Sequence, residues 1–187
     1  MLKPPITLID NWLDQTGSEE LFTELLTTID WQYEIVKMFD NSIIVPRKIA
    51  WFGDADATYR YSGLTHKPLP WIRALHILQQ KLEVERSLKF NGVLCNLYND
   101  GKNYMGWHRD NEPELGSDPI IASVSLGEPR RFIFRHILSD VKHEIILNSG
   151  SLLLMHEGCQ QYWQHSLPKM MSVKSPRINL TFRHTQH

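Results

Sequence analysis

The hydrophobic pattern in the first half of the chain predicts two amphipathic helices. Apolar residues recur at helical spacing through 16–30, where Thr16 and Glu19 have the spacing of a capping box. A second apolar stripe runs from about Pro70 to Glu85, and a proline suits the first turn of a helix. No internal repeat, low-complexity segment or long linker interrupts the sequence.

The pattern changes at about residue 91, where short β-rich or alternating stretches follow one another between Gly, Pro, Asn and Asp. The expected strands are 92–98, 120–126, 131–136, 144–147, 151–155 and 177–183. Short strands without intervening helices predict an antiparallel barrel or double-sheet fold. We therefore expect a mixed α/β, mainly β protein that forms a single domain over 1–187. Its N-terminal part (1–90) and its β-rich part (91–187) are not expected to fold separately.

Composition and charge restrict this picture only slightly. The chain has 187 residues, 42% hydrophobic and 22% charged, which is ordinary for a soluble domain. A net charge of -1 means that any nucleic-acid surface must be a local patch. No apolar run approaches the roughly 18–20 residues that cross a bilayer, and no signal peptide is apparent. We expect an intracellular monomer without a membrane partner, cytoplasmic if bacterial and nuclear if eukaryotic, with Cys95 and Cys159 reduced.

Three side chains have the chemistry of a metal site. In an extended backbone His108 and Asp110 point to one side, and His165 is the candidate third ligand. Two imidazoles and one carboxylate on one face leave positions open, as non-haem iron(II) requires. The H-x-D spacing alone is weak evidence, because the chain has nine histidines and a surface histidine is the usual explanation.

The C-terminal strand 177–183 carries unusual polar residues on one face. Its alternation separates an apolar face from a polar one made of Arg177, Asn179, Thr181 and Arg183. An arginine fork holds a carboxylate by two parallel hydrogen bonds, so this face suits a dicarboxylate ligand. Asn96 and Tyr98 share a face of strand 92–98 and offer an amide and a phenol. The alternative is a solvated basic strand.

Taken together, the motifs resemble the AlkB family of iron(II)/2-oxoglutarate dioxygenases. The matching segments are LCNLY at 94–98, WHRDNEPELGSDPIIASVSLG at 107–127 and PRINLTFR at 176–183, with His165 between the last two. The resemblance extends upstream through VPRKIAWFGDADATYRYSGLT at 45–65 and covers about residues 38 to 184. It is closest to the branch of the nuclear alkylation-repair homologues two and three. The joint order of the motifs is highly specific, whereas H-x-D alone is not.

The resemblance implies a double-stranded β-helix, or jelly roll, with an N-terminal nucleotide-recognition lid. By this similarity His108, Asp110 and His165 bind Fe(II), and Arg183 pairs with the distal carboxylate of 2-oxoglutarate. The implied 2-oxoglutarate residues are Asn96, Tyr98, Arg177 and Arg183, with Asn179 and Thr181 nearby. The family's reaction uses O2 and 2-oxoglutarate to hydroxylate an N-alkyl carbon, after which formaldehyde leaves. Its typical substrates are 1-methyladenine and 3-methylcytosine, so the resemblance implies repair of alkylated DNA.

A base inside a duplex cannot reach buried iron, so the substrate side needs aromatic surfaces for a flipped base. Tyr59, Tyr61 and Ser62 fall in the lid segment, and Tyr61 is the expected stacking partner together with His108. The alternative for both tyrosines is lid core. Asn111 and Glu112 directly follow the iron motif and are expected at the base edge. Phe39 is either an intercalating wedge or a buried lid residue.

Basic residues supply the expected phosphate contacts. They are Arg47, Lys48, Arg130, Arg131 and Arg135. Two other functions remain open from the sequence: an oxygenase acting on RNA or protein, and a metal-binding jelly roll without turnover. A zinc hydrolase with the same three ligands is disfavoured, because it has no use for an arginine pair.

Overall fold

The structure is a computed structural model that describes residues 2–38, 41–61 and 64–186, with the backbone only at 36–38, 41–43, 59–61 and 64–66. The predicted substrate residues Phe39 and Ser62 lie outside these ranges. The elements are β1 (Ile6–Ile9), α1 (Gln15–Thr28), β2 (Gln32–Met38), β3 (Asn41–Gly53), β4 (Tyr59–Tyr61), β5 (Leu64–His66), α2 (Arg73–Arg86), β6 (Gly92–Tyr98), β7 (Met105–His108), η1 (Pro113–Leu115), β8 (Ile121–Gly127), β9 (Arg130–His136), β10 (Lys142–Leu147), β11 (Leu152–Met155), α3 (Cys159–Tyr162), β12 (Trp163–Leu167) and β13 (Arg177–Arg183).

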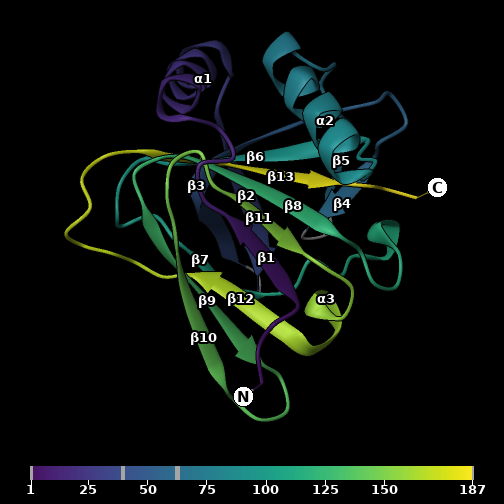
Figure 1. Ribbon diagram of the computed structural model, residues 1–187, viewed down its shortest axis with the longest axis vertical. Helices are drawn as coiled ribbons and strands as arrows, with labels where there is room; N and C mark the ends of the chain where they lie inside the picture. The colour runs from purple at the N-terminus through teal and green to yellow at the C-terminus, as the bar shows by residue number, and fades with distance from the viewer. Residues whose placement is uncertain (1, 39–40, 62–63, 187) are drawn as a thin grey trace.

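The strands form two main antiparallel sheets. The major sheet has seven strands in the order β1-β11-β8-β13-β6-β3-β2, and the minor sheet has four in the order β10-β9-β12-β7. β4 and β5 form a separate two-stranded sheet. Figure 1 shows the minor sheet on one side of the major sheet and both long helices on the other. The predicted double-sheet, jelly-roll fold is confirmed.

Period-two alternation divides the major sheet between two cores. On β13, Ile178, Leu180 and Phe182 join the helical residues Leu25 and Leu75 in one buried cluster. A second buried cluster joins both sheets and is made of residues such as Trp51, Leu94, Ile121, Phe134 and Trp163. The opposite face of β13 therefore points toward the space between the sheets. This placement makes the polar face of β13 an interior surface.

The element boundaries agree with the sequence prediction for the best-patterned segments and differ at the helix starts. The predicted strands 92–98 and 177–183 coincide with β6 and β13. The capping box at Thr16 was wrong, because Asp14 is the N-cap and accepts a 2.7 Å hydrogen bond from the Gly17 N–H. The helix predicted from Pro70 begins at Arg73.

Several strands were not predicted. β2 and β3 extend the major sheet, and in the minor sheet β7 forms an edge while β12 lies between β9 and β7. Within the described part of the chain, no helix combines the length and apolar character needed to cross a membrane.

Candidate metal centre and co-substrate cavity

The three predicted metal ligands meet at the junction of β7 and β12. His108, the last residue of β7, pairs directly with His165 on β12, and Asp110 follows in the next loop. The two imidazole centroids are 4.2 Å apart in an edge-to-face arrangement. His108 Nε2 lies 3.8 Å from Asp110 Oδ1, and one ligand atom from each residue lies within 4.8 Å of the others. The structure thus brings the whole predicted triad together.

The protonation states at this cluster suit a cation. Burial lowers the pKa of His165 to about 3, helped by the neighbouring His108, and burial also lowers the pKa of His108. Burial alone would raise the pKa of Asp110, but Arg183 and the two imidazoles lower it to about 2. The cluster therefore presents two neutral imidazoles and one carboxylate at neutral pH, which is the donor set of a divalent metal.

Hydrogen bonds fix the imidazole of His108. Its Nδ1 lies 2.9 Å from the carbonyl oxygen of Gly106, so a protonated Nδ1 donates there and leaves the Nε2 lone pair facing Asp110. His165 Nδ1 is buried and has no hydrogen-bond partner among the described residues. A buried ring nitrogen without a partner is costly, and a ligand at the site would satisfy such an atom.

Arg183 lies at the metal end of the cavity. Its Nη2 donates a 3.0 Å hydrogen bond to Asp110 Oδ1, and each of these two side chains is only 5% exposed. The loop after β7 returns to the end of β13 and supplies Arg183 with this internal carboxylate. The sequence predicted that Arg183 pairs with the distal carboxylate of 2-oxoglutarate, and this stays a prediction, although the contact with Asp110 favours Arg177 for that role.

Arg177, at the other end of β13, has no such partner. Its Nη2 donates to Ser125 Oγ at 2.9 Å and to Asn179 Oδ1 at 2.8 Å, and its guanidinium carbon lies 5.5 Å from the Tyr98 ring centroid. Its Nε is buried without a hydrogen-bond partner, and no salt bridge to Arg177 occurs within the described ranges. Burial lowers the pKa of Arg177 to about 10. A buried cation in this setting calls for an anion from outside the chain.

The wall between the two arginines is a continuous polar network. Ser123 Oγ and Arg177 both donate to Asn179 Oδ1, which turns the Asn179 amide nitrogen toward Thr181 Oγ1 at 2.7 Å. Next to β13, Arg47 Nε on β3 donates to Asn96 Oδ1 on β6 at 2.7 Å. These bonds hold the amides in one orientation, so the wall is organised before any ligand arrives.

One cavity joins the metal end to the arginine end. It is lined by Arg47, Leu94, Asn96, Tyr98, Met105, His108, Asp110, Ser123, Phe132, Met155, His165, Leu167, Arg177, Asn179, Thr181 and Arg183. All three predicted metal ligands and all six predicted co-substrate residues are in this set. Since Arg177 and Arg183 are 2% and 4% exposed, the alternative of a solvated basic strand was wrong.

Comparison with known proteins gives the family. The sequence model of the 2OG-Fe(II) oxygenase superfamily matches residues 5–183. The chain belongs to this superfamily. Membership of this superfamily and the His-Asp-His cluster together support the use of iron(II), 2-oxoglutarate and O2. The structure titled "The structure of OsALKBH1" shares the fold, with a TM-score of 0.68 and 15% identity over 98% of this chain and 100% of that one.

Curated relatives place the chain in the AlkB family. It is 41% identical over 177 residues to DNA oxidative demethylase ALKBH2 of Bos taurus, covering 89% of this chain and 64% of that protein. The Homo sapiens ALKBH2 is 41% identical over 89% of this chain and 68% of that protein. Alpha-ketoglutarate-dependent dioxygenase alkB homolog 3 of Mus musculus is 35% identical over 95% and 65%. The chain thus spans about two thirds of the length of these relatives.

Two of the basic residues expected to contact phosphate are unavailable in this AlkB-family protein. Arg47 is 3% exposed and bonded to Asn96, and Arg130 is 1% exposed and donates to the carbonyls of Asp100, Asn103 and Pro168. A surface phosphate contact by either residue was therefore a wrong prediction. The residue type alone does not reveal whether an arginine is exposed at the surface or buried and hydrogen-bonded to loop carbonyls.

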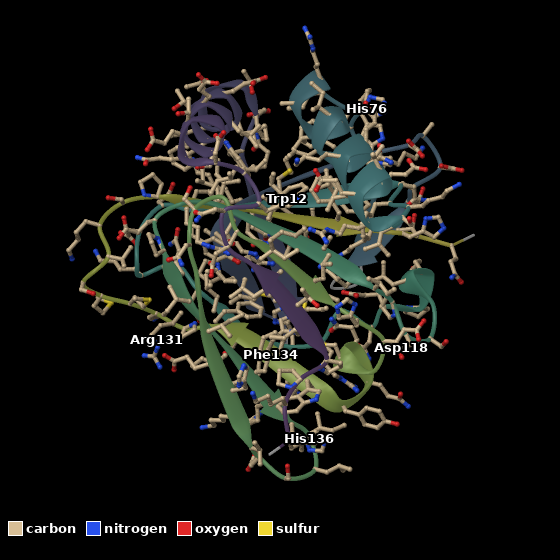
Figure 2. The ribbon with its side chains drawn as sticks, in the orientation of Figure 1. Trp12, His76, Asp118, Arg131, Phe134 and His136 are labelled. Atoms are coloured by element: carbon tan, nitrogen blue, oxygen red, sulfur yellow. The ribbon has the colours of Figure 1, made fainter. Side chains whose placement is uncertain are left out.

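The other basic candidates lie at the surface. Arg131 points away from the sheets in Figure 2 and pairs with Glu144 at 2.8 Å. Arg135 donates to Gln164 and stacks 4.5 Å from the ring centroid of the exposed Trp107. Its predicted substrate contact stays a prediction.

The remaining substrate residues are placed only in part. Asn111 and Glu112 follow Asp110 in the chain but are absent from the cavity lining. Tyr59 and Tyr61 lie on β4, where the structure describes the backbone only. Their predicted roles in binding a base stay predictions.

Sequence reasoning missed three residues that support the site. Ser123 and Ser125 alternate with apolar residues on β8 in the same way as the polar residues of β13, so this pattern could have revealed them. Gln160 Oε1 accepts a 2.9 Å hydrogen bond from the Asp110 N–H. No local pattern points to Gln160, because its partner lies 50 residues away in the chain.

Proposed function

We propose that this protein catalyses iron(II)- and 2-oxoglutarate-dependent oxidative demethylation of N-alkylated bases in DNA, as a direct-reversal repair enzyme. The observation that carries the proposal is one cavity with a His-Asp-His cluster at one end and, at the other, Arg177, which has no anionic partner among the described residues. The relatives named as DNA oxidative demethylases supply the substrate class.

Each end of the cavity has a separate task in this proposal. His108, Asp110 and His165 hold iron(II), and Arg177 with Asn179 and Tyr98 holds the distal carboxylate of 2-oxoglutarate. Bound iron, O2 and 2-oxoglutarate together supply the oxidation that hydroxylates the N-alkyl carbon. The hydroxylated carbon leaves as formaldehyde, and 2-oxoglutarate becomes succinate and carbon dioxide. Arg183 orients the Asp110 carboxylate throughout.

Base and strand contacts complete the proposal. Tyr61 stacks on the flipped base from the β4–β5 lid, and His108, whose side chain is 25% exposed, borders its path. Asn111 and Glu112 meet the base edge. Arg135 contacts phosphate beside Trp107, and such contacts weaken as salt rises. The enzyme acts as a monomer.

The test is direct. The protein with iron(II), ascorbate and 2-oxoglutarate is incubated with a 1-methyladenine or 3-methylcytosine oligonucleotide, and formaldehyde, succinate and repaired base are measured. We expect stoichiometric formation of all three with wild type and none with Asp110→Ala. Single-stranded DNA, duplex DNA and RNA of one sequence are compared, and faster repair of RNA would contradict the assignment to DNA. Succinate without base repair would indicate a different substrate, and absence of both would favour a non-catalytic module.

A further inference from the structure

The three metal ligands are not held in the same way. His108 and His165 face each other across paired strands, so the β7–β12 ladder fixes their backbones. Asp110 lies beyond the end of β7, in a segment without regular structure. Some other contact must therefore hold its backbone at the cluster.

Gln160 makes that contact. Its Oε1 accepts the Asp110 backbone N–H at 2.9 Å, and its side chain is buried at 1% exposure. Its Nε2 lies 3.5 Å from the sulfur of Met155, a residue that lines the metal cavity. Because the Asp110 N–H is a donor and needs an acceptor, the oxygen of the Gln160 amide must face Asp110. The amide thus has one satisfactory orientation.

The turn that carries Gln160 is itself anchored. α3 begins after Gly158, which has a left-handed φ of 83°. The Gly158 N–H donates to both carboxylate oxygens of Asp118, at 2.8 and 2.7 Å, and Asp118 is labelled beside α3 in Figure 2. α3 leads directly into β12, which carries His165. Gln160 therefore connects the Asp110 loop to the strand of the third ligand.

We propose that Gln160 is a positioning residue for the metal centre, which sets the Asp110 backbone relative to His165. It acts on the backbone of Asp110, whereas Arg183 acts on the carboxylate through its 3.0 Å hydrogen bond. Gln160 does not itself supply a metal ligand. This inference rests on the metal site of the proposed function, and it adds a residue outside the ligand set.

The test compares two substitutions on the same turn. Gln160→Met keeps an unbranched side chain of similar length but removes the acceptor, and Gln161→Met makes the same chemical change at an exposed neighbouring position. Metal-free proteins are titrated anaerobically with Mn(II) by calorimetry, at a temperature where circular dichroism shows them folded. Residues that orient metal ligands typically contribute about 10- to 100-fold in affinity. We expect a Kd for Mn(II) about 10- to 100-fold weaker in Gln160→Met and within about twofold of wild type in Gln161→Met.

A second readout separates positioning from simple stability. Loss of the Asp110 orientation should also change the visible absorption spectrum of the Co(II)-loaded protein, whereas a purely structural role would lower only the Tm of the metal-free protein. If Gln160→Met does not fold, Gln160→Asn serves, because it keeps the amide but withdraws its oxygen by one methylene.

The outcomes are distinct. A variant with a lower Tm but wild-type Mn(II) affinity and Co(II) spectrum would overturn the inference and leave the proposed function intact. Failure of wild type itself to bind Mn(II) would remove the metal site, and with it both the proposed function and the role of Gln160.

Discussion

The two ends of β13 carry the same residue in opposite circumstances. Arg183 and Arg177 are both buried, on one face of one strand. Arg183 has an internal anion, Asp110, at 3.0 Å. Among the described residues, the partners of Arg177 Nη2 are the neutral side chains of Ser125 and Asn179.

This difference distinguishes a buried charge that stabilises the free protein from a buried charge that binds a ligand. Removing one partner of a buried ion pair leaves an uncompensated charge, so the metal-end arginine contributes to the stability of the free protein. A buried arginine without an anion costs desolvation free energy in the free protein and recovers it when a carboxylate binds. The metal-end arginine thus has an internal anion in the free protein, whereas Arg177 has none among the described residues.

The largest expected effect comes from replacing each arginine by methionine. Arg183→Met should lower the free energy of unfolding of the metal-free protein by about 3–5 kcal/mol, because it strands the Asp110 carboxylate. Arg177→Met should lower the free energy of unfolding by less than about 1 kcal/mol, and an increase would agree equally well with the removal of a buried charge. Urea unfolding of the two metal-free variants measures the difference.

The two arginine variants should also differ in their affinity for 2-oxoglutarate. Arg177→Met is expected to weaken 2-oxoglutarate binding to the Mn(II)-loaded protein by about 100-fold, through loss of charge-assisted hydrogen bonds worth roughly 1.5–3 kcal/mol each. Calorimetric titration with 2-oxoglutarate checks this. Equal destabilisation by both substitutions, with unchanged binding in Arg177→Met, would contradict the division between the two ends.

The sequence was sufficient for the faces of β13 but not for its direction relative to the metal. Alternation placed both arginines on one face, and the jelly-roll fold and the His-Asp-His set followed from local spacing and resemblance. Which arginine meets Asp110 depends on the path of the loop after β7, which no periodicity encodes. The same holds for Gln160, whose contact joins the short helix α3 to the irregular segment of Asp110, 50 residues away in the chain. The predicted phosphate contact of Arg130 was wrong for a related reason. Its three carbonyl partners, at Asp100, Asn103 and Pro168, are distant in sequence, so no local pattern reveals them.

The next effect should appear in the acid stability of the metal end. Burial lowers the folded-state pKa of His165 to about 3, below the usual value near 6.5. As pH falls below about 6.5, the unfolded state takes up a proton that the folded state refuses until about pH 3. The metal-free protein should therefore lose stability across this window, by at most about 4 kcal/mol from His165.

Urea unfolding between pH 7 and pH 3 measures this loss. His165→Leu should flatten the dependence, while Arg177→Met should leave its slope as in wild type, because nothing at the far end titrates in this range. A wild-type slope in His165→Leu would mean that this histidine is not buried in its neutral form.

The smallest effect tests how the far end is organised. Ser125 Oγ accepts from Arg177 at 2.9 Å, so Ser125→Ala leaves the guanidinium in place but frees it to turn. One such hydrogen bond is worth about 1 kcal/mol, which predicts a KM for 2-oxoglutarate raised about fivefold with kcat unchanged. Ser172→Ala, at an exposed position in the loop before β13, is the matched control and should leave KM unchanged. A fall in kcat in Ser125→Ala would instead mean that Ser125 also affects the metal site. The two ends of the cavity would then not act independently.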